Sequence, residues 1–208
     1  MLLIRGCAMR DQGTDDIVYW IGRHLDGDPQ AFESIYDLTI GKVYKLVYFL
    51  IGDKAEAEDV VQDVYMQLYR YMHHYDRSRP FDKWLNGIIV RRVGDHRQKR
   101  WKLSRLMHKA IQFESKETVD FEDAIVDSVA NEQLLRHIQS LPMKLKTVII
   151  LYYLNDYSQV EVAELLGIPT GTVKSRLNRG LEQLRKKRAI WNLASGKDVT
   201  EAWILRTK

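Results

Sequence analysis

Apolar residues return at helix-like intervals along most of the chain, and this periodicity limits the possible folds more than any other feature. The alternating pattern of half-buried strands, bounded by hairpin turns, is missing from the sequence. A first helical block covers about residues 15–101 and a second covers about residues 131–188. Turn residues interrupt the first block at Gly27-Asp28-Pro29, Gly52-Asp53 and 76–80. The pattern predicts an all-α chain of two small helical domains, with four helices in the first.

Three further segments complete the expected organisation. Residues 1–14 are expected to form a disordered leader, and residues 189–208 a C-terminal extension of unassigned role. Between the blocks, residues 102–130 are expected to form a linker, because the stretch from Ile111 to Asp127 holds six acids against the single cation Lys116. Such charge runs usually keep two folded parts apart in solvent.

Composition excludes several classes of protein. Lys and Arg number 32 against 28 Asp and Glu, a net charge of +4 that is too small by itself to indicate a polyanionic partner. Cys7 is the only cysteine, so an internal disulfide framework is impossible and a reducing, cytoplasmic location is expected. No apolar run approaches the length that spans a membrane. The six histidines lack metal-ligand spacing, and we expect no metal or cofactor.

A helix-turn-helix is predicted in the second block. Ser158-Gln159-Val160-Glu161 matches a capping box, so a helix should begin at about Gln159. Gly167 can adopt the left-handed conformation that ends this helix, and Thr170 can cap its successor. The two helices should therefore meet across a tight turn.

The second of these helices has two contrasting faces. Val173, Leu177, Leu181 and Leu184 fall within one quarter of its circumference and should be buried. Short polar groups and cations occupy the rest, as suits a helix in a DNA major groove. The residues expected to meet DNA are Thr172, Lys174, Ser175, Arg176, Asn178 and Arg179. An ordinary helical hairpin with a solvated basic face is the alternative.

A helix that opens with acids is expected from about Lys54. One of its faces should be core and carries Ala57, Val60, Val64, Leu68 and Tyr71. The opposite face carries Asp59, Gln62, Asp63 and Met66, with Glu56 at the edge. A purely solvated face is one interpretation; an exposed methionine among acids also suits a partner that surrounds an apolar spot with cations.

Aromatic and cationic residues gather from Tyr75 to Leu85, in a loop that enters another helix. The stretch from Arg91 to Lys102 then holds many cations and the single acid Asp95. Rings stack on unpaired bases and cations follow a phosphate backbone, so this combination favours single-stranded nucleic acid. The alternative is that Phe81 and Trp84 are core and the cations only solubilise the helix.

Taken in order, these motifs resemble the extracytoplasmic-function group of bacterial RNA polymerase sigma factors over roughly residues 15–188. The resemblance rests on six stretches: Gly27–Phe32, Ala57–Val64, Phe81 with Trp84-Leu85, Asp95-His96-Arg97, Tyr157–Ala163 and Gly171–Arg176. Arg91 departs from the family, which commonly has Asn there, so the preferred −10 sequence of this chain is expected to be unusual.

The resemblance implies that residues 15–101 are sigma region 2 and residues 131–188 are sigma region 4. It implies a complex with core RNA polymerase, through the clamp coiled coil of the beta-prime subunit and the beta flap, and control by an anti-sigma factor. Region 2 would bind the clamp through Asp59, Gln62, Asp63 and Met66. It would read melted −10 DNA through Tyr75, Arg77, Arg79, Phe81, Trp84, Arg91, Arg97 and Arg100. Region 4 would read the −35 element through the helix-turn-helix residues given above, and neither region would be catalytic.

Two other classes of protein share some of these features. A stand-alone repressor or activator would use the same helix-turn-helix, usually as a symmetric dimer, but leaves the acidic face and the aromatic loop unexplained. A DNA-cutting enzyme would need clustered carboxylates or a placed nucleophile, and the acids near residues 53–63 lie on an outer face instead.

Overall fold

The structure, a computed structural model, describes residues 12–108 and 135–195, and all regular elements in these ranges are helical. The all-α prediction is therefore confirmed for this part of the chain. The elements are α1 (Gln12–Leu25), α2 (Ala31–Ile51), α3 (Lys54–Tyr71), a 3-10 turn η1 (Met72–His74), α4 (Phe81–His108), a short helical stretch at 135–139, α6 (Met143–Tyr153), α7 (Gln159–Leu166) and α8 (Thr170–Ser195).

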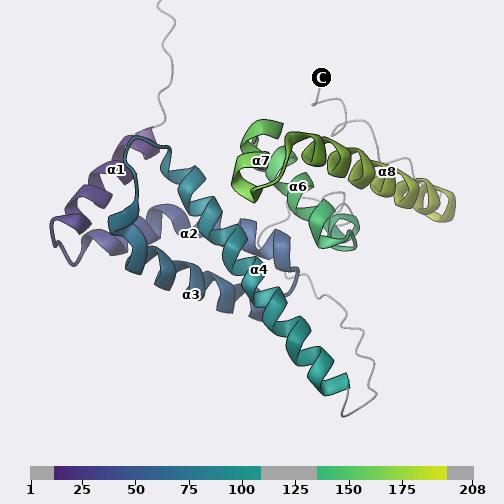
Figure 1. The fold of residues 1–208 in the computed structure, drawn as a ribbon, viewed down its shortest axis with the longest axis horizontal. Helices are drawn as coiled ribbons and strands as arrows, with labels where there is room; N and C mark the ends of the chain where they lie inside the picture. Colours follow the sequence, from purple (N-terminus) through teal and green to yellow (C-terminus); the bar gives the residue numbers. More distant parts are fainter. Residues whose placement is uncertain (1–11, 109–134, 196–208) are drawn as a thin grey trace, which may run out of the picture.

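The helices form an N-terminal group and a C-terminal group that touch (Figure 1). Helices α1 to α4 pack on one another, and α6, α7 and α8 form a second group. Helix α2 contacts α6, and α4 contacts α7, so both groups share one continuous set of buried apolar residues. The C-terminal part of α4 projects away from the body as a single helix.

Local signals set the junction between α2 and α3. Gly52 ends α2 in the left-handed conformation, with φ at 89°, and its N–H donates to the Tyr48 carbonyl at 2.8 Å. A side chain is rarely tolerated at such a φ, which accounts for glycine here. Asp53 then caps α3, because its carboxylate accepts a hydrogen bond from the Glu56 N–H at 2.8 Å.

The helix-turn-helix forms largely as the sequence predicts. Ser158 and Glu161 make both hydrogen bonds of the capping box, α7 begins at Gln159, and Gly167 ends it with φ at 60°. The expected cap at Thr170 is wrong, because Thr170 is already the first residue of α8. The carbonyl of Pro169 instead accepts from the Thr172 N–H at 2.8 Å.

Three helices extend beyond the blocks expected from the sequence. Helix α1 begins at Gln12, inside the expected leader, and the rest of that leader lies outside the described residues. Helix α4 continues past residue 101 to His108, since no proline or glycine follows Gly94 in it. Helix α8 reaches Ser195, whereas the remainder of the C-terminal extension is not described.

The core face of α3 is broader than predicted and ends earlier. Ala57, Val60, Val64 and Leu68 are fully buried as expected. The prediction for Tyr71 is wrong, because its side chain is 46% exposed. The chain turns into η1 at this point, and Met72 takes the buried place that the helical pattern assigned to Tyr71.

Among the described residues, no helix combines the length and the apolar character that a membrane span requires.

A buried lysine lies where the two groups meet. Lys146 in α6 is 3% exposed, and its ammonium donates to the Gln139 side chain at 2.7 Å. Gln139 in turn donates to the carbonyls of Tyr48 at 3.3 Å and Phe49 at 2.8 Å, at the C-terminal end of α2. Burial, with the like charge of Arg97 on α4, lowers the pKa of Lys146 to about 8. The bridge therefore joins α6 to the carbonyl end of α2 through one amide.

This lowered pKa predicts a pH-dependent stability. As the pH rises, Lys146 loses its proton at a lower pH in the folded protein than in the unfolded chain. The unfolded state therefore binds more protons between about pH 8 and 10.5. The free energy of unfolding of wild type should rise across that window relative to Lys146→Met, by up to about 1.4 kcal/mol per pH unit. Urea unfolding of both proteins from pH 7 to 10 measures this difference. A difference that stays constant with pH would contradict the assignment.

Candidate functional site

Helix α8 presents the face that the sequence assigned to DNA. Val173 and Leu177 are buried, and Gly180 lies against α6, where an added Cβ would stand 3.0 Å from Ile149. This close approach fixes α8 on its apolar side. The six predicted residues occupy the remaining surface: Lys174, Ser175, Asn178 and Arg179 are exposed, and Thr172 and Arg176 are half-buried.

A side-chain hydrogen bond holds one polar residue in place at the start of α8. The Ser175 hydroxyl donates to the Thr172 carbonyl at 3.0 Å, inside the same helix. Arg179 lies one turn further along α8 and is exposed to solvent. An exposed guanidinium next to short polar groups can reach base edges, whereas Lys174 can only act as a point charge on phosphate.

The acidic face of α3 is exposed as predicted. Asp59, Gln62 and Asp63 point away from the buried face, and Met66 is 47% exposed. Together these four side chains form one surface that combines negative charge with an apolar spot.

An aromatic groove adjoins this acidic face. It lies between α2 and α3, has a volume of about 690 Å³, and includes both Gln62 and Met66 in its lining. Tyrosines supply much of the rest of the lining: Tyr36, Tyr44, Tyr65 and Tyr69. Sequence reasoning missed this groove, although the eight-residue interval from Tyr36 to Tyr44 and the four-residue interval from Tyr65 to Tyr69 place each pair on one helix face.

The aromatic residues of the 75–81 loop are mostly internal. Tyr75 and Phe81 are 7% and 2% exposed, and their ring centroids lie 5.4 Å apart in an edge-on contact. The Tyr75 hydroxyl donates to the Arg79 carbonyl at 2.5 Å, which shapes the loop. Trp84 joins the cluster and is only half-buried. The two inner rings thus support Trp84, which is the ring of this cluster that is most open to solvent.

Exposed cations lie on the loop of this aromatic cluster and further along α4. Arg77 and Arg79 are exposed in the loop, and Arg91, Arg97 and Arg100 are exposed along α4. All five side chains are exposed, and two of them also form ion pairs within the chain, Arg79 with Asp76 and Arg100 with Glu56.

Glu56 holds the last of these cations. It lies at the start of α3, forms an ion pair with Arg100, and lies within hydrogen-bond distance of the His96 ring, at 3.2 Å. Sequence reasoning placed Glu56 at the edge of the acidic face and did not find these partners, which lie about 40 residues further along the chain. Their only signal is that an acid occurs at a helix start while cations gather in a distant helix.

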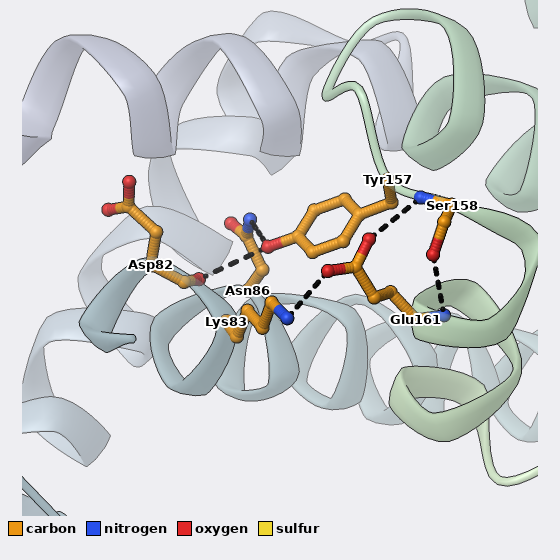
Figure 2. A network of polar contacts seen from close by, with 6 residues as sticks. All are labelled: Asp82, Lys83, Asn86, Tyr157, Ser158 and Glu161. Atoms are coloured by element: carbon orange, nitrogen blue, oxygen red, sulfur yellow. Dashed lines mark hydrogen bonds and ion pairs between the residues drawn. The ribbon is translucent and has the colours of Figure 1, made fainter. Parts of the chain in front are cut away.

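Polar side chains join α4 to the start of α7 (Figure 2). The Lys83 ammonium lies 2.6 Å from a Glu161 carboxylate oxygen. The Asn86 amide donates to the Tyr157 hydroxyl at 2.6 Å. Figure 2 shows that Glu161 also accepts from the Ser158 N–H, at 2.8 Å. The Glu161 carboxylate thus both caps α7 and binds Lys83 of α4.

The hydrogen bond from Lys83 is the main cause that lowers the pKa of Glu161 to about 2, and bonds from Ser158 add to it. The same hydrogen bond raises the pKa of Lys83. Both partners therefore stay charged from below pH 4.5 to above pH 10.5, and the ion pair persists across the whole neutral range.

The family description "Sigma-70 region 2" matches residues 35–103, and "Sigma-70, region 4" matches residues 131–184. The ECF RNA polymerase sigma factor SigW of Bacillus subtilis is 34% identical over 169 residues, which is 77% of this chain and 90% of that protein. The RNA polymerase sigma factor SigV of the same organism is 30% identical over 142 residues, or 68% and 81% of the two chains.

Solved structures agree on the fold. The sigma factor RpoE of Bartonella quintana, in complex with the anti-sigma factor NepR, has a TM-score of 0.65 at 22% identity and covers 76% of this chain and 96% of its own. CnrH in complex with the cytosolic domain of CnrY has a TM-score of 0.58 at 19% identity, over 85% and 99% of the chains. With both family regions present in order on this helical fold, the chain belongs to the extracytoplasmic-function (ECF) RNA polymerase sigma factors.

Proposed function

We propose that this protein binds core RNA polymerase and directs it to a promoter class by reading a −35 duplex and a melted −10 strand. The observation that carries the proposal is that three surfaces of different chemistry occur on one chain. These are the polar and cationic face of α8, the cations around Trp84 on α4, and the acidic face of α3. The polymerase performs the chemistry, and melting draws on binding energy.

Core polymerase would bind the acidic face of α3. Asp59 and Asp63 are one helical turn apart and both exposed, so they can pair with cations of the beta-prime clamp coiled coil. Met66 and the tyrosine-lined groove beside it offer the apolar contact that a charged rim surrounds in many interfaces. The beta flap would contact the C-terminal group of helices.

Promoter DNA would be read at two places. Helix α8 would lie in the major groove of the −35 element, with Arg179 at base edges and Lys174 at phosphates. At the −10 element, Trp84 would stack on an unpaired base while Arg77, Arg79, Arg91, Arg97 and Arg100 follow the strand. Tyr75 and Phe81 would support Trp84 from inside. The domain division into region 2, linker and region 4 follows from this assignment.

An anti-sigma factor is the expected regulator, acting in the cytoplasm. A stand-alone repressor or activator would use α7 and α8 alone, and it would leave the acidic face of α3 and the groove without a purpose.

Reversing two charges tests the polymerase surface. Asp59→Arg with Asp63→Arg should raise the Kd for purified bacterial core polymerase by roughly 100-fold or more, because like charges would then face each other. Run-off transcription on promoter fragments from the host should be lost with it. Fluorescence anisotropy measures the first effect and gel analysis of transcripts the second.

A matched control is available on α2. Glu33 and Asp37 are exposed acids with the same four-residue spacing, outside the groove lining. Glu33→Arg with Asp37→Arg should bind polymerase as wild type does. Equal loss in both double variants, or tight binding by the α3 variant, would contradict the assigned surface. Absence of discrete transcripts with wild type would refute the proposed function.

A single arginine tests base reading. Arg179→Ala should weaken binding to the selected −35 sequence by about 1–3 kcal/mol and relax discrimination at one base pair. Arg185 is an exposed cation outside the predicted set. Arg185→Ala should lower the affinity for every DNA sequence by about the same amount, and by less than Arg179→Ala lowers it for the selected sequence. Competition binding over single-base variants of the −35 element measures both. If Arg179→Ala lowers affinity equally for every sequence, Arg179 binds phosphate and reads no base.

A further inference from the structure

Glu56 lies between the surface proposed for core polymerase and the surface proposed for −10 DNA. On α3 it comes one helical turn before Asp59 and two turns before Asp63. At about 100° per residue, these three carboxylates fall within about 60° of the helix circumference. Glu56 is therefore the first acid of the row that the clamp coiled coil is proposed to bind.

Both carboxylate oxygens of Glu56 are occupied by side chains of α4, the helix that packs beside α3 (Figure 1). The Arg100 guanidinium pairs with Oε1, and the His96 ring lies 3.2 Å from Oε2. The Glu56 side chain is 21% exposed and that of Arg100 is 55% exposed. Because Arg100 belongs to the cations proposed for the −10 strand, one acid of the polymerase surface neutralises one cation of the DNA surface.

This pair differs from the other ion pair in the −10 set. Arg79 pairs with Asp76 at 3.5 Å, three residues earlier in the same loop. That pair lies within one surface and leaves the acidic face of α3 unaffected. The pair of Glu56 with Arg100 joins two helices and two surfaces, so a partner that binds at one surface changes the charge at the other.

The energetics allow the pair to be exchanged. An ion pair whose arginine is half-exposed contributes little free energy, because water already solvates much of the charge. A phosphate that approaches Arg100 while the pair is intact also meets the negative charge of Glu56, and like charges repel. Cations that neutralise Glu56 from the α3 side would remove this repulsion and leave the guanidinium to the phosphate.

We infer that Glu56 masks Arg100 in the free protein. Cations of core polymerase pair with Glu56 and thereby release Arg100 to the phosphates of the melted −10 strand. Since coupling between two binding sites is reciprocal, the strand strengthens polymerase binding by the same factor. The inference rests on the proposed function, because it uses both the polymerase surface and the −10 surface.

Removal of the charge at Glu56 tests the inference in the free, full-length protein. Glu56→Gln keeps the side-chain length, and the cap of α3 by Asp53 uses the backbone N–H of residue 56, which the substitution retains. The variant should bind a fluorescein-labelled single strand from a transcribed −10 element about 1.5- to 5-fold more tightly than wild type. The slope of log K against log salt should steepen by about 0.7, as one more phosphate contact requires. Fluorescence anisotropy at several salt concentrations measures both.

Two controls isolate the pair. Glu33 is an exposed acid in the first turn of α2, as Glu56 is in the first turn of α3. Glu33→Gln changes the net charge equally and should strengthen strand binding less than Glu56→Gln does. In an Arg100→Ala background, Glu56→Gln should have no larger effect than Glu33→Gln. A gain that persists without Arg100 would contradict the inference.

Addition of core polymerase tests the release step. In the complex, wild type and Glu56→Gln should bind the strand with equal affinity, because Glu56 no longer pairs with Arg100. Polymerase should therefore raise the strand affinity of wild type about 1.5- to 5-fold more than that of Glu56→Gln. If the two complexes still differ as the free proteins do, polymerase does not release Arg100 and the inference is wrong.

The outcomes separate the inference from the proposed function. Equal strand affinity of free wild type and free Glu56→Gln overturns the inference alone, provided that wild type directs transcription. Weaker binding by Glu56→Gln also overturns it, since Glu56 would then only hold Arg100 in place. If wild type gives no discrete transcripts with core polymerase, the proposed function fails and the inference fails with it.

Discussion

The buried apolar core that runs through both groups of helices sets their relative position. Within it α2 packs against α6, and α4 packs against α7. The ion pair between Lys83 and Glu161 adds a polar contact where α4 meets α7. Glu161 also caps α7, so one carboxylate both starts the helix-turn-helix and ties it to α4.

In each proposed surface, buried residues hold the exposed residues in place. In the surface proposed for −10 DNA, Tyr75 and Phe81 lie inside and contact Trp84, while the arginines remain exposed. On α8, the approach of Gly180 to Ile149 fixes the helix and leaves its polar side free. The acidic face of α3 stands on a fully buried row from Ala57 to Leu68. In each case a buried face positions an exposed face.

Features that depend on neighbours in the chain could be predicted from the sequence. The capping box at Ser158, the left-handed Gly167 and the buried Val173 and Leu177 all follow from residues within one or two helical turns. The predicted burial of Tyr71 is wrong because it continues the helical period past the point where the chain turns into η1.

Features that join distant segments could not be predicted. Glu56 meets Arg100, Asn86 meets Tyr157, and Gln139 meets the end of α2, and no local pattern indicates any of these partners. The burial of Lys146 could not be predicted either, since its sequence neighbours do not show which helix will cover it. The sequence thus indicated the surfaces proposed for DNA and polymerase, whereas the contacts between distant segments required the fold.

The most direct test of the account is run-off transcription with purified bacterial core polymerase on promoter fragments from the host. The polymerase with this protein should start transcripts at discrete sites, and the polymerase alone should not. Transcripts that do not depend on the protein, or no discrete transcripts in its presence, would contradict the account.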